Sequence, residues 1–216
     1  MSINMNWNEI IGHEKNIAQL QRLLLEQRLP HALLFCGPRG IGKFLTARVL
    51  AAALLCDAGS ADPCGHCESC RAYLAGTHPD LYEIEPDGKT LKTIKIDQIR
   101  TLQAEIALAP YMSQRRVVII DEADKLNEVA ANGLLKTLED PTGQVVFILI
   151  ATGREALLDT IVSRVSTVSF QPLPVPQLTD ALARRGVSVN AALAALAGGS
   201  FGRALDLDKN GGLSLR

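Results

Sequence analysis

The sequence predicts an α/β fold with a central, mostly parallel five-stranded sheet and a small helical domain after it. Three observations lead to this prediction. A glycine-rich turn, residues 37–42, lies between an apolar run and an alanine-rich helix. A second apolar run, residues 117–120, leads directly into acidic residues. A proline-rich segment, residues 171–176, then separates the predicted strands from a series of short helices.

The composition is that of an ordinary globular protein. The 216 residues are 47% hydrophobic and 21% charged, with a net charge of −1. This charge and an aromatic content of 4% argue against a nucleic-acid-binding surface. Apolar stretches such as residues 49–55 fall far short of the ~20 residues that span a bilayer, and residues 1–7 form no signal-peptide core. We therefore expect a cytoplasmic protein with no membrane partner.

The glycine-rich turn predicts a phosphate-binding loop. Residues 37–43 have the spacing G-x-x-x-x-G-K, between a buried strand at 31–35 and a helix at 41–55. Glycines let the backbone N–H groups surround an anion, and the helix points its positive end at the same place. Lys43 would reach the β- and γ-phosphates of a nucleotide. The predicted nucleotide-binding glycines are Gly37, Gly40 and Gly42.

The residue after Lys43 departs from this pattern. A Ser or Thr is expected there because its hydroxyl holds Mg²⁺, but the chain has Phe44, whose ring offers no oxygen ligand. Thr46 is turned by roughly 200° around the helix, so we do not expect it to replace the hydroxyl. The loop therefore predicts weak binding of ATP or ADP, poor placement of Mg²⁺ and negligible hydrolysis.

A cluster of cysteines predicts a structural zinc module at about residues 56–70. Its ligands would be Cys56, Cys64, Cys67 and Cys70. Four thiolates close a tetrahedral shell around Zn²⁺ and leave no position for water. His66 is a substitute ligand, and a redox C-x-x-C pair is an alternative that the third and fourth cysteines argue against. We expect Cys36, on the first strand, to be a buried apolar residue.

The second apolar run predicts the other half of a nucleotide site. Before it, we expect a strand at 81–84 and a helix from Asp97, as its N-cap, to about residue 109. The β-branched residues 117–120 predict a strand buried on both faces. In a phosphate-loop ATPase, Asp121 would orient Mg²⁺ and Glu122 would polarise the attacking water. The alternative is an acidic turn that caps a helix.

The remaining elements complete a core and a lid. We expect a helix over 126–138 and strands over 144–152 and 167–170. Thr152 either touches a γ-phosphate or caps the next helix. The prolines of residues 171–176 predict a semi-rigid link between a core, residues 1–171, and a lid, residues 172–216. The lid helices are expected at residues 177–185, 189–197 and 201–208.

Together these features resemble the AAA+ clamp-loader subunits of bacterial DNA polymerase III over nearly the whole chain. The resemblance rests on residues 31–35, 37–43, 56–70, 121–124, 134–141 and 163–164. It implies an AAA+ phosphate-loop core with a zinc-module insertion, followed by a small helical lid domain. It also implies a third, collar domain in the family, which we do not expect within these residues.

The resemblance leaves two branches of the family, the γ/τ motor subunits and the δ′ stator. Phe44 and Gly202 favour the stator, because motors carry the Mg²⁺-binding hydroxyl and a sensor-2 arginine at these positions. Arg203 comes one position late, which is roughly 100° around a helix. The resemblance then implies that Arg164 is an arginine finger offered to a neighbouring ATPase subunit and that Glu122 is vestigial.

The implied partners are the clamp-loader motor and delta subunits, with the sliding clamp and primer–template DNA reached through the complex. Two alternatives remain from the residues: a motor subunit that hydrolyses ATP itself, and a zinc-module nucleic-acid binder. Without the resemblance, Arg164 is simply a surface ion-pair residue.

Overall fold

The computed structural model describes the chain except for residues 1–5, 89–91, 142, 185, 188–190 and 210–216. Its sheet has the strand order β2-β3-β4-β1-β5, and every pairing between the described strands is parallel. The predicted α/β fold with a five-stranded sheet is therefore confirmed. The strands are β1 (Ala32–Cys36), β2 (Leu81–Ile84), β3 (Arg116–Ile120), β4 (Val145–Ala151) and β5 (Ser166–Ser169).

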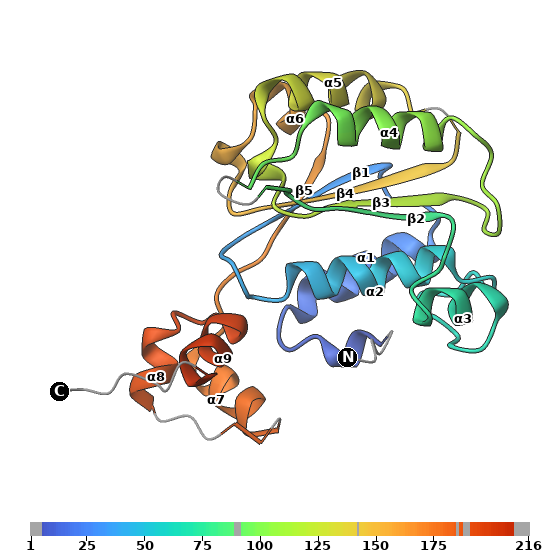
Figure 1. Cartoon of the computed structure of the whole chain (residues 1–216). Coiled ribbons are helices and arrows are strands. Elements are labelled where there is room, and N and C mark those ends of the chain that lie inside the picture. Colours follow the sequence, from blue (N-terminus) through green and yellow to red (C-terminus); the bar gives the residue numbers. More distant parts are fainter. Residues whose placement is uncertain (1–5, 89–91, 142, 185, 188–190, 210–216) are drawn as a thin grey trace.

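Helices cover both faces of the sheet (Figure 1). One face carries α1 (Glu14–Leu25), α2 (Lys43–Leu55) and α3 (Glu68–Leu74). The other carries α4 (Ile96–Ile106), α5 (Glu128–Glu139) and α6 (Asp159–Val162). Short 3-10 helices lie at Trp7–Glu9, Ala123–Lys125 and Arg154–Ala156. No helix in the described part of the chain combines the length and apolarity needed to cross a membrane.

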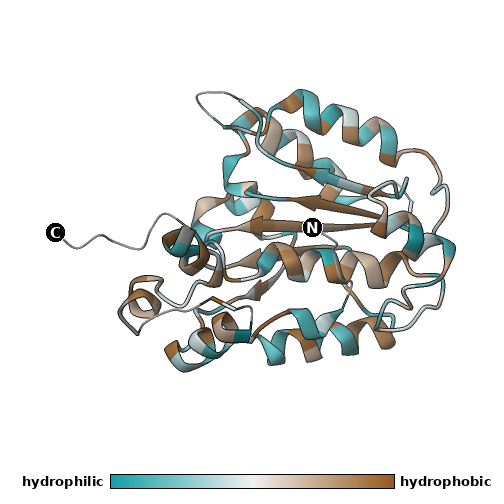
Figure 2. Ribbon diagram, turned by 60° about the horizontal axis from the view of Figure 1, so that its bottom comes forward, coloured by the Kyte–Doolittle hydropathy of each residue, from teal (hydrophilic) through white to brown (hydrophobic). Residues whose placement is uncertain are grey.

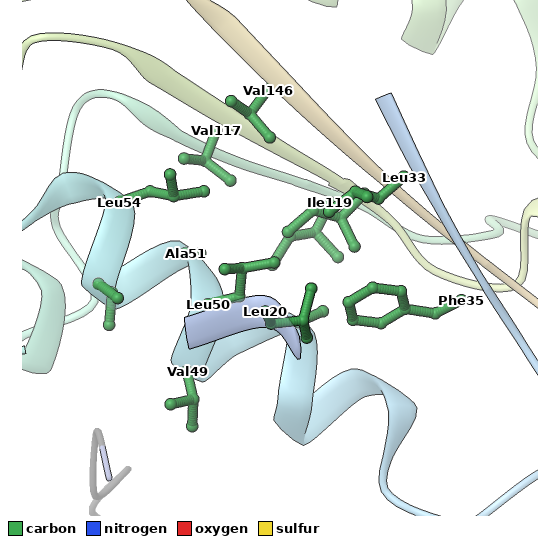
Figure 3. Packing of buried hydrophobic residues seen from close by; sticks show 14 of the residues in the cluster. Leu20, Leu33, Phe35, Val49, Leu50, Ala51, Leu54, Val117, Ile119 and Val146 are labelled. Carbon is green, nitrogen blue, oxygen red and sulfur yellow. The ribbon is translucent and has the colours of Figure 1, made fainter. Parts of the chain in front are cut away.

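Each face of the sheet has its own apolar cluster, because alternate strand residues point in opposite directions. Leu33 and Phe35 of β1 belong to the cluster under α1 and α2, whereas Leu34 and Cys36 belong to the other cluster. Figure 3 shows Phe35 pointing toward Leu20 of α1. Figure 2 shows the sheet as an apolar layer between helices of mixed hydropathy. Cys36 is buried, as predicted.

The last three helices pack around an apolar cluster of their own (Figure 1). They are α7 (Val175–Arg184), α8 (Ala191–Leu196) and α9 (Phe201–Lys209). The predicted extended link through residue 176 is wrong, because α7 already begins at Val175. Proline fits the first turn of a helix, where its missing N–H has no partner to lose. Leu173 is buried, and its N–H donates to the Gly199 oxygen at 2.9 Å.

The predicted N-cap of the fourth helix is also wrong. α4 begins at Ile96 with Lys95 as its cap residue, so Asp97 lies inside the first turn. Gln98, the third residue of the helix, accepts the backbone N–H of Lys95 with Oε1 at 3.0 Å, which is the returning half of a capping box. The carboxylate of Asp97 still lies at the positive end of the helix dipole. The helix ends at Ile106, three residues before the predicted end.

A buried polar network fastens the segment after α4 to the sheet. Asp80 is fully buried and accepts hydrogen bonds from the backbone N–H groups of residues 111–113, at 2.7, 2.8 and 2.8 Å. Arg116, equally buried, places Nε 3.6 Å from Asp80 Oδ1 and donates to the carbonyl oxygens of Glu105 and Ala109. Burial raises the pKa of Asp80, but the three N–H donors outweigh it, so the net pKa is lowered.

Candidate functional site

A cavity of about 430 Å³ is formed by the phosphate loop and by residues that follow β3 and β4. These segments meet because the carboxyl ends of parallel strands lie at one edge of a sheet. The cavity brings together most of the predicted nucleotide-site residues: Gly40, Gly42, Lys43, Asp121, Glu122 and Thr152. The two chemical landmarks of the sequence therefore form one site.

Gly37 is the predicted nucleotide-site residue that does not line this cavity. Its φ is 151°, and a Cβ there would lie 2.4 Å from the backbone oxygen of Phe170. Glycine is required at this position because the loop passes close to the residue that follows β5. Gly37 thus shapes the loop, and its carbonyl oxygen accepts a hydrogen bond from Lys43 at 2.6 Å.

The Lys43 ammonium points back at its own loop. Nζ donates to the carbonyl oxygens of Gly37 and Pro38, at 2.6 and 2.7 Å. Burial lowers the pKa of Lys43, while the negative charges of Asp121 and Asp124 act in the opposite direction. A phosphate oxygen would give the ammonium a charged acceptor in place of two neutral ones, and such bonds are the stronger kind.

Acidic side chains also line the cavity: Asp121, Glu122 and Asp124. Asp121 Oδ1 accepts the N–H of Glu122 at 2.9 Å, and burial raises the pKa of Asp121. Glu122 pairs with Arg39 of the phosphate loop, with 2.6 Å between Oε2 and Nη2. Asp124 Oδ1 is buried and has no hydrogen-bond partner within the described chain.

Phe44 lines the cavity and also packs against the core cluster beneath it. The Arg48 guanidinium lies 5.7 Å from the centre of its ring. Thr46 is buried, and its hydroxyl donates to the Gly42 oxygen at 2.9 Å, so it is turned away from the cavity as predicted. Lys43 and the start of α2 fit a phosphate, but position 44 supplies no oxygen for Mg²⁺.

Apolar side chains form one wall of the cavity. The residues of this apolar wall come from both ends of the chain: Ile10, Ile11, Leu173, Phe201 and Leu205. Such a wall suits the flat face of a nucleobase. The sequence patterns do not mark these residues, since isolated apolar side chains carry no motif. They do not mark Arg39 either, because its partner Glu122 is 83 residues away.

Thr152 lines the cavity but does not cap a helix. The 3-10 helix that follows has Gly153 at its N-cap position and no side-chain cap. The predicted capping role of Thr152 is therefore wrong. Its predicted contact with a γ-phosphate is compatible with its position.

The four predicted zinc ligands converge on one point. The sulfurs of Cys56, Cys64, Cys67 and Cys70 all lie within 4.8 Å of one another. Cys56 and Cys67 are 4.0 Å apart, and Cys64 and Cys70 are 3.9 Å apart. A tetrahedral Zn²⁺ site with Zn–S bonds of about 2.3 Å places its sulfurs about 3.8 Å apart. The donor set and its spacing therefore fit Zn²⁺.

Backbone N–H groups favour thiolates at this site. Three of them donate to ligand sulfurs at 3.3–3.4 Å, including Cys64 N–H to Cys56 and Cys70 N–H to Cys67. The N–H groups of His66 and Cys67 lower the pKa of the Cys64 thiol to about 6. His66 itself is exposed and lies outside the ligand group, which argues against it as a substitute ligand.

Arg164 follows α6 and lies outside the cavity lining. Its guanidinium donates to the Glu139 carboxylate, with Nε 2.7 Å from Oε1, and to the Thr160 oxygen at 2.6 Å. The side chain is 31% exposed. The structure thus places Arg164 in a surface ion pair, away from the nucleotide cavity of its own chain.

Comparisons with known proteins agree with this architecture. A family profile described as "DNA polymerase III, delta subunit" matches residues 12–174. The delta′ subunit of Bacillus subtilis is 36% identical over 208 residues, covering 95% of this chain and 62% of the relative. The delta′ subunit of Pseudomonas aeruginosa is 40% identical over 176 residues, covering 79% and 53%. The tau subunit of Escherichia coli is 37% identical over 175 residues, covering 81% and 27%.

Solved structures share the fold at lower sequence identity. A gamma subunit-related protein of Thermotoga maritima DNA polymerase III has a TM-score of 0.53 and 22% identity, over 89% of this chain and 60% of that one. The RuvB branch migration motor of the same organism has a TM-score of 0.62 and 18% identity, over 97% and 65%. The chain has the AAA+ fold.

The chain spans 62% and 53% of the two delta′ relatives. The profile covers all five strands and the cysteine segment, and the relatives include both delta′ and tau subunits. Together these findings show that the chain belongs to the DNA polymerase III clamp-loader family.

Proposed function

We propose that this chain is a delta′-type stator subunit of the clamp loader, which binds nucleotide weakly and does not hydrolyse it. The observation that carries the proposal is Phe44, an apolar ring at the Mg²⁺ position of an otherwise assembled cavity. Residues 1–171 would form its AAA+ core and residues 172–216 its lid. Its partners would be the motor and delta subunits, and through them the sliding clamp and primer–template DNA.

The residues of the cavity support binding without turnover. Lys43 and the start of α2 would hold the phosphates, and the apolar wall would hold the base. A bound Mg²⁺ would neutralise charge that develops on the transferring phosphoryl group. Phe44 supplies no ligand for Mg²⁺, so the ion would not hold the γ-phosphate in place. Glu122 would then have no correctly placed phosphate toward which to direct a water molecule. Glu122 is also occupied by its ion pair with Arg39.

Arg164 would contribute to catalysis at the ATP site of a neighbouring subunit. An arginine finger of this kind is worth about 10³–10⁵ in rate where it has been measured. Its planar guanidinium suits a phosphate better than a lysine ammonium does. In the isolated chain, Glu139 and Thr160 occupy the donors that a phosphate would take.

The test of nucleotide binding is a titration of fluorescent ADP and ATP, with Mg²⁺ and with EDTA, followed by a steady-state ATPase assay. Binding that ignores Mg²⁺, without turnover, is the expected result. Mg²⁺-enhanced binding with turnover would assign the chain to the motor branch instead. That alternative is favoured by one observation, the presence of Lys43, Asp121 and Glu122 together in the cavity.

The test of the stator role is Arg164→Ala in a loader assembled with this chain. ATP hydrolysis at the adjoining motor site should fall by at least about 1,000-fold, the lower end of the range for a lost arginine finger. Arg154→Ala is the control, because it removes an exposed arginine that lies elsewhere on the sheet, after β4 rather than before β5. Unchanged hydrolysis with Arg164→Ala would remove the finger role and leave only the surface ion pair.

A further inference from the structure

The lid helix α9 begins directly on the phosphate loop. The N–H of Gly202 donates to the carbonyl oxygen of Gly40 at 2.8 Å, and the Ser200 hydroxyl donates to the carbonyl oxygen of Arg39 at 2.8 Å. Ser200 is buried, and its oxygen in turn accepts the N–H of Arg203 at 3.1 Å. Two consecutive carbonyl groups of the loop are therefore held by the first residues of the lid helix.

This contact requires glycine at position 202. A Cβ there would lie 2.9 Å from Gly40 Cα and 3.3 Å from the Gly40 oxygen, and both are backbone atoms that cannot swing aside. A Cβ on Gly40 would lie 2.6 Å from Ser200 Oγ and 3.1 Å from Gly202 Cα. Gly202 does not have a positive φ, so its backbone conformation alone would accept any residue. Glycine is needed at position 202 because the backbone of residue 40 lies too close to leave room for a side chain.

The same helix supplies part of the cavity wall. Phe201, Gly202 and Leu205 of α9 line the cavity together with Leu173. A second backbone contact supports the arrangement, since the Leu173 N–H donates to the Gly199 oxygen at 2.9 Å. The apolar wall is thus fixed over the phosphate loop by contacts that involve no ligand.

We propose that Ser200 and Gly202 are positioning residues that seat the lid helix on the phosphate loop, so that the pocket is complete before a ligand arrives. The ligand class is a nucleoside phosphate, and in this respect alone the inference rests on the proposed function. The seat consists of the hydrogen bonds from Ser200 and Gly202 to the carbonyl oxygens of Arg39 and Gly40. A ligand moves a lid only if its difference in affinity for the two lid positions outweighs the contacts that hold the lid. The lid of this chain therefore stays in place whether ADP, ATP or neither is bound.

Hydrogen–deuterium exchange of the full chain tests this, because the seat includes an amide hydrogen bond. In the wild type, the lid peptide covering residues 199–206 should be equally protected without ligand, with ADP and with a slowly hydrolysed ATP analogue. The loop peptide covering residues 37–45 is compared between variants in the ligand-free state, because a bound phosphate would protect its amides directly. Gly202→Ala should speed exchange in the lid peptide at least about tenfold and weaken ADP binding at least about fivefold. Faster exchange would be diagnostic, because alanine has a higher helix propensity than glycine and would by itself slow exchange in the helix.

Two further variants complete the test. Ser200→Ala removes two hydrogen bonds without adding an atom, and it should loosen both peptides even if Gly202→Ala does not fold. Arg203→Ala is the control, since its side chain is exposed on the same helix, and it should change neither peptide. Gly202→Ala or Ser200→Ala with wild-type protection would overturn the proposal. A wild-type lid whose protection changes about tenfold between ADP and the ATP analogue would overturn it equally.

The seat of the lid helix and the proposed stator function are tested by different measurements. Exchange in the ligand-free chain tests the seat even if no nucleotide binds, whereas Arg164→Ala and the ATPase assay test the stator role. A seated lid in a chain that hydrolyses ATP would refute the stator and leave the seat intact.

Discussion

Phe44 stands where a phosphate loop needs a hydroxyl, and its ring is shared between the cavity and the core. Phe44→Thr should restore an oxygen ligand, so that ADP binds roughly tenfold more tightly with Mg²⁺ than with EDTA. The wild type should show less than about a twofold difference. Loss of the half-buried ring should cost about 1–2 kcal/mol of unfolding free energy, less than the 3–5 kcal/mol of a fully buried one.

Phe44→Leu is the matched control for this prediction. It removes the ring but supplies no oxygen, so it should lose similar stability and gain no Mg²⁺ dependence. Calorimetric titration with ADP measures the first effect, and urea denaturation measures the second. Equal Mg²⁺ dependence in the Thr and Leu variants would show that the hydroxyl is not what the site lacks.

Arg39 and Glu122 form an exposed pair beside the cavity, where such pairs contribute little to folding and can exchange partners. Glu122→Gln removes a negative charge and releases Arg39, so ADP should bind about three- to tenfold more tightly in EDTA. Arg39→Gln should weaken binding by a similar factor. Both effects should shrink as KCl rises, because exposed charges are screened. Glu128→Gln, an exposed carboxylate outside the cavity, should have no effect.

At the scale of elements, the cysteine segment joins the end of α2 to α3 through four sulfurs at zinc-site spacing. The purified chain should hold one equivalent of zinc, measured by mass spectrometry. Chelation should loosen the segment and make its four cysteines reactive to a thiol reagent, although Cys56 and Cys70 are buried in the folded module. Cys36 should stay protected because it lies on the central strand β1. Because zinc requires thiolates, acid should release the metal. The pKa of Cys64, lowered to about 6, should let that thiolate persist to lower pH than an ordinary cysteine.

Cys67→Ser is the variant that tests the module as a unit, and Cys36→Ser is its control. The first should abolish stoichiometric zinc, and the second should leave zinc content unchanged, since Cys36 lies on β1 away from the cluster. Full zinc content after Cys67→Ser would mean that the four sulfurs do not form the site.

The network around Asp80 connects β2, β3 and the segment after α4. Asp80→Asn should lower the unfolding free energy at pH 7 by about 3–5 kcal/mol, because it leaves Arg116 buried without its counter-charge. The folded-state pKa of Asp80 is lowered, so its contribution is complete above about pH 4 and is lost as pH falls through the folded pKa. The gap between the wild type and the variant should therefore narrow in acid.

Asp97→Asn is the control for this pH dependence. Its side chain is 84% exposed and forms a surface ion pair with Arg100 at 3.6 Å, so the stability change should stay under about 0.5 kcal/mol. Urea denaturation between about pH 3 and pH 7 measures both variants. A gap for Asp80→Asn that does not change with pH would contradict the assigned role of the carboxylate charge.

Element types were predictable from the sequence, but their ends were less so. The apolar runs before Gly37 and Asp121 identified two central strands because both are buried on each face. Asp97 misled the prediction because an acidic residue suits both the cap and the first turn. The prolines at 174 and 176 were predicted to form a linker, yet Pro176 lies in the first turn of α7 and Pro174 directly precedes that helix.

At the scale of the whole molecule, motif spacing located the residues that follow their own strands, such as Lys43 and Asp121. Contacts between distant segments carried no local signal. The Arg39–Glu122 pair depends on the sheet order, and the Gly40–Gly202 contact depends on how the lid docks. The sequence analysis marked Gly202 only as a missing arginine, whereas in the structure it allows two stretches of backbone to touch.

The buried helix α2 connects the nucleotide pocket to the cysteine module. It begins at Lys43 beside the phosphate loop and ends at Leu55, next to the first cysteine ligand, so its 13 residues measure about 20 Å. Core packing surrounds most of it, and a close-packed helix cannot slide or rotate without opening voids. The helix therefore keeps the distance between the cysteine module and the nucleotide pocket constant, whether or not either site is occupied.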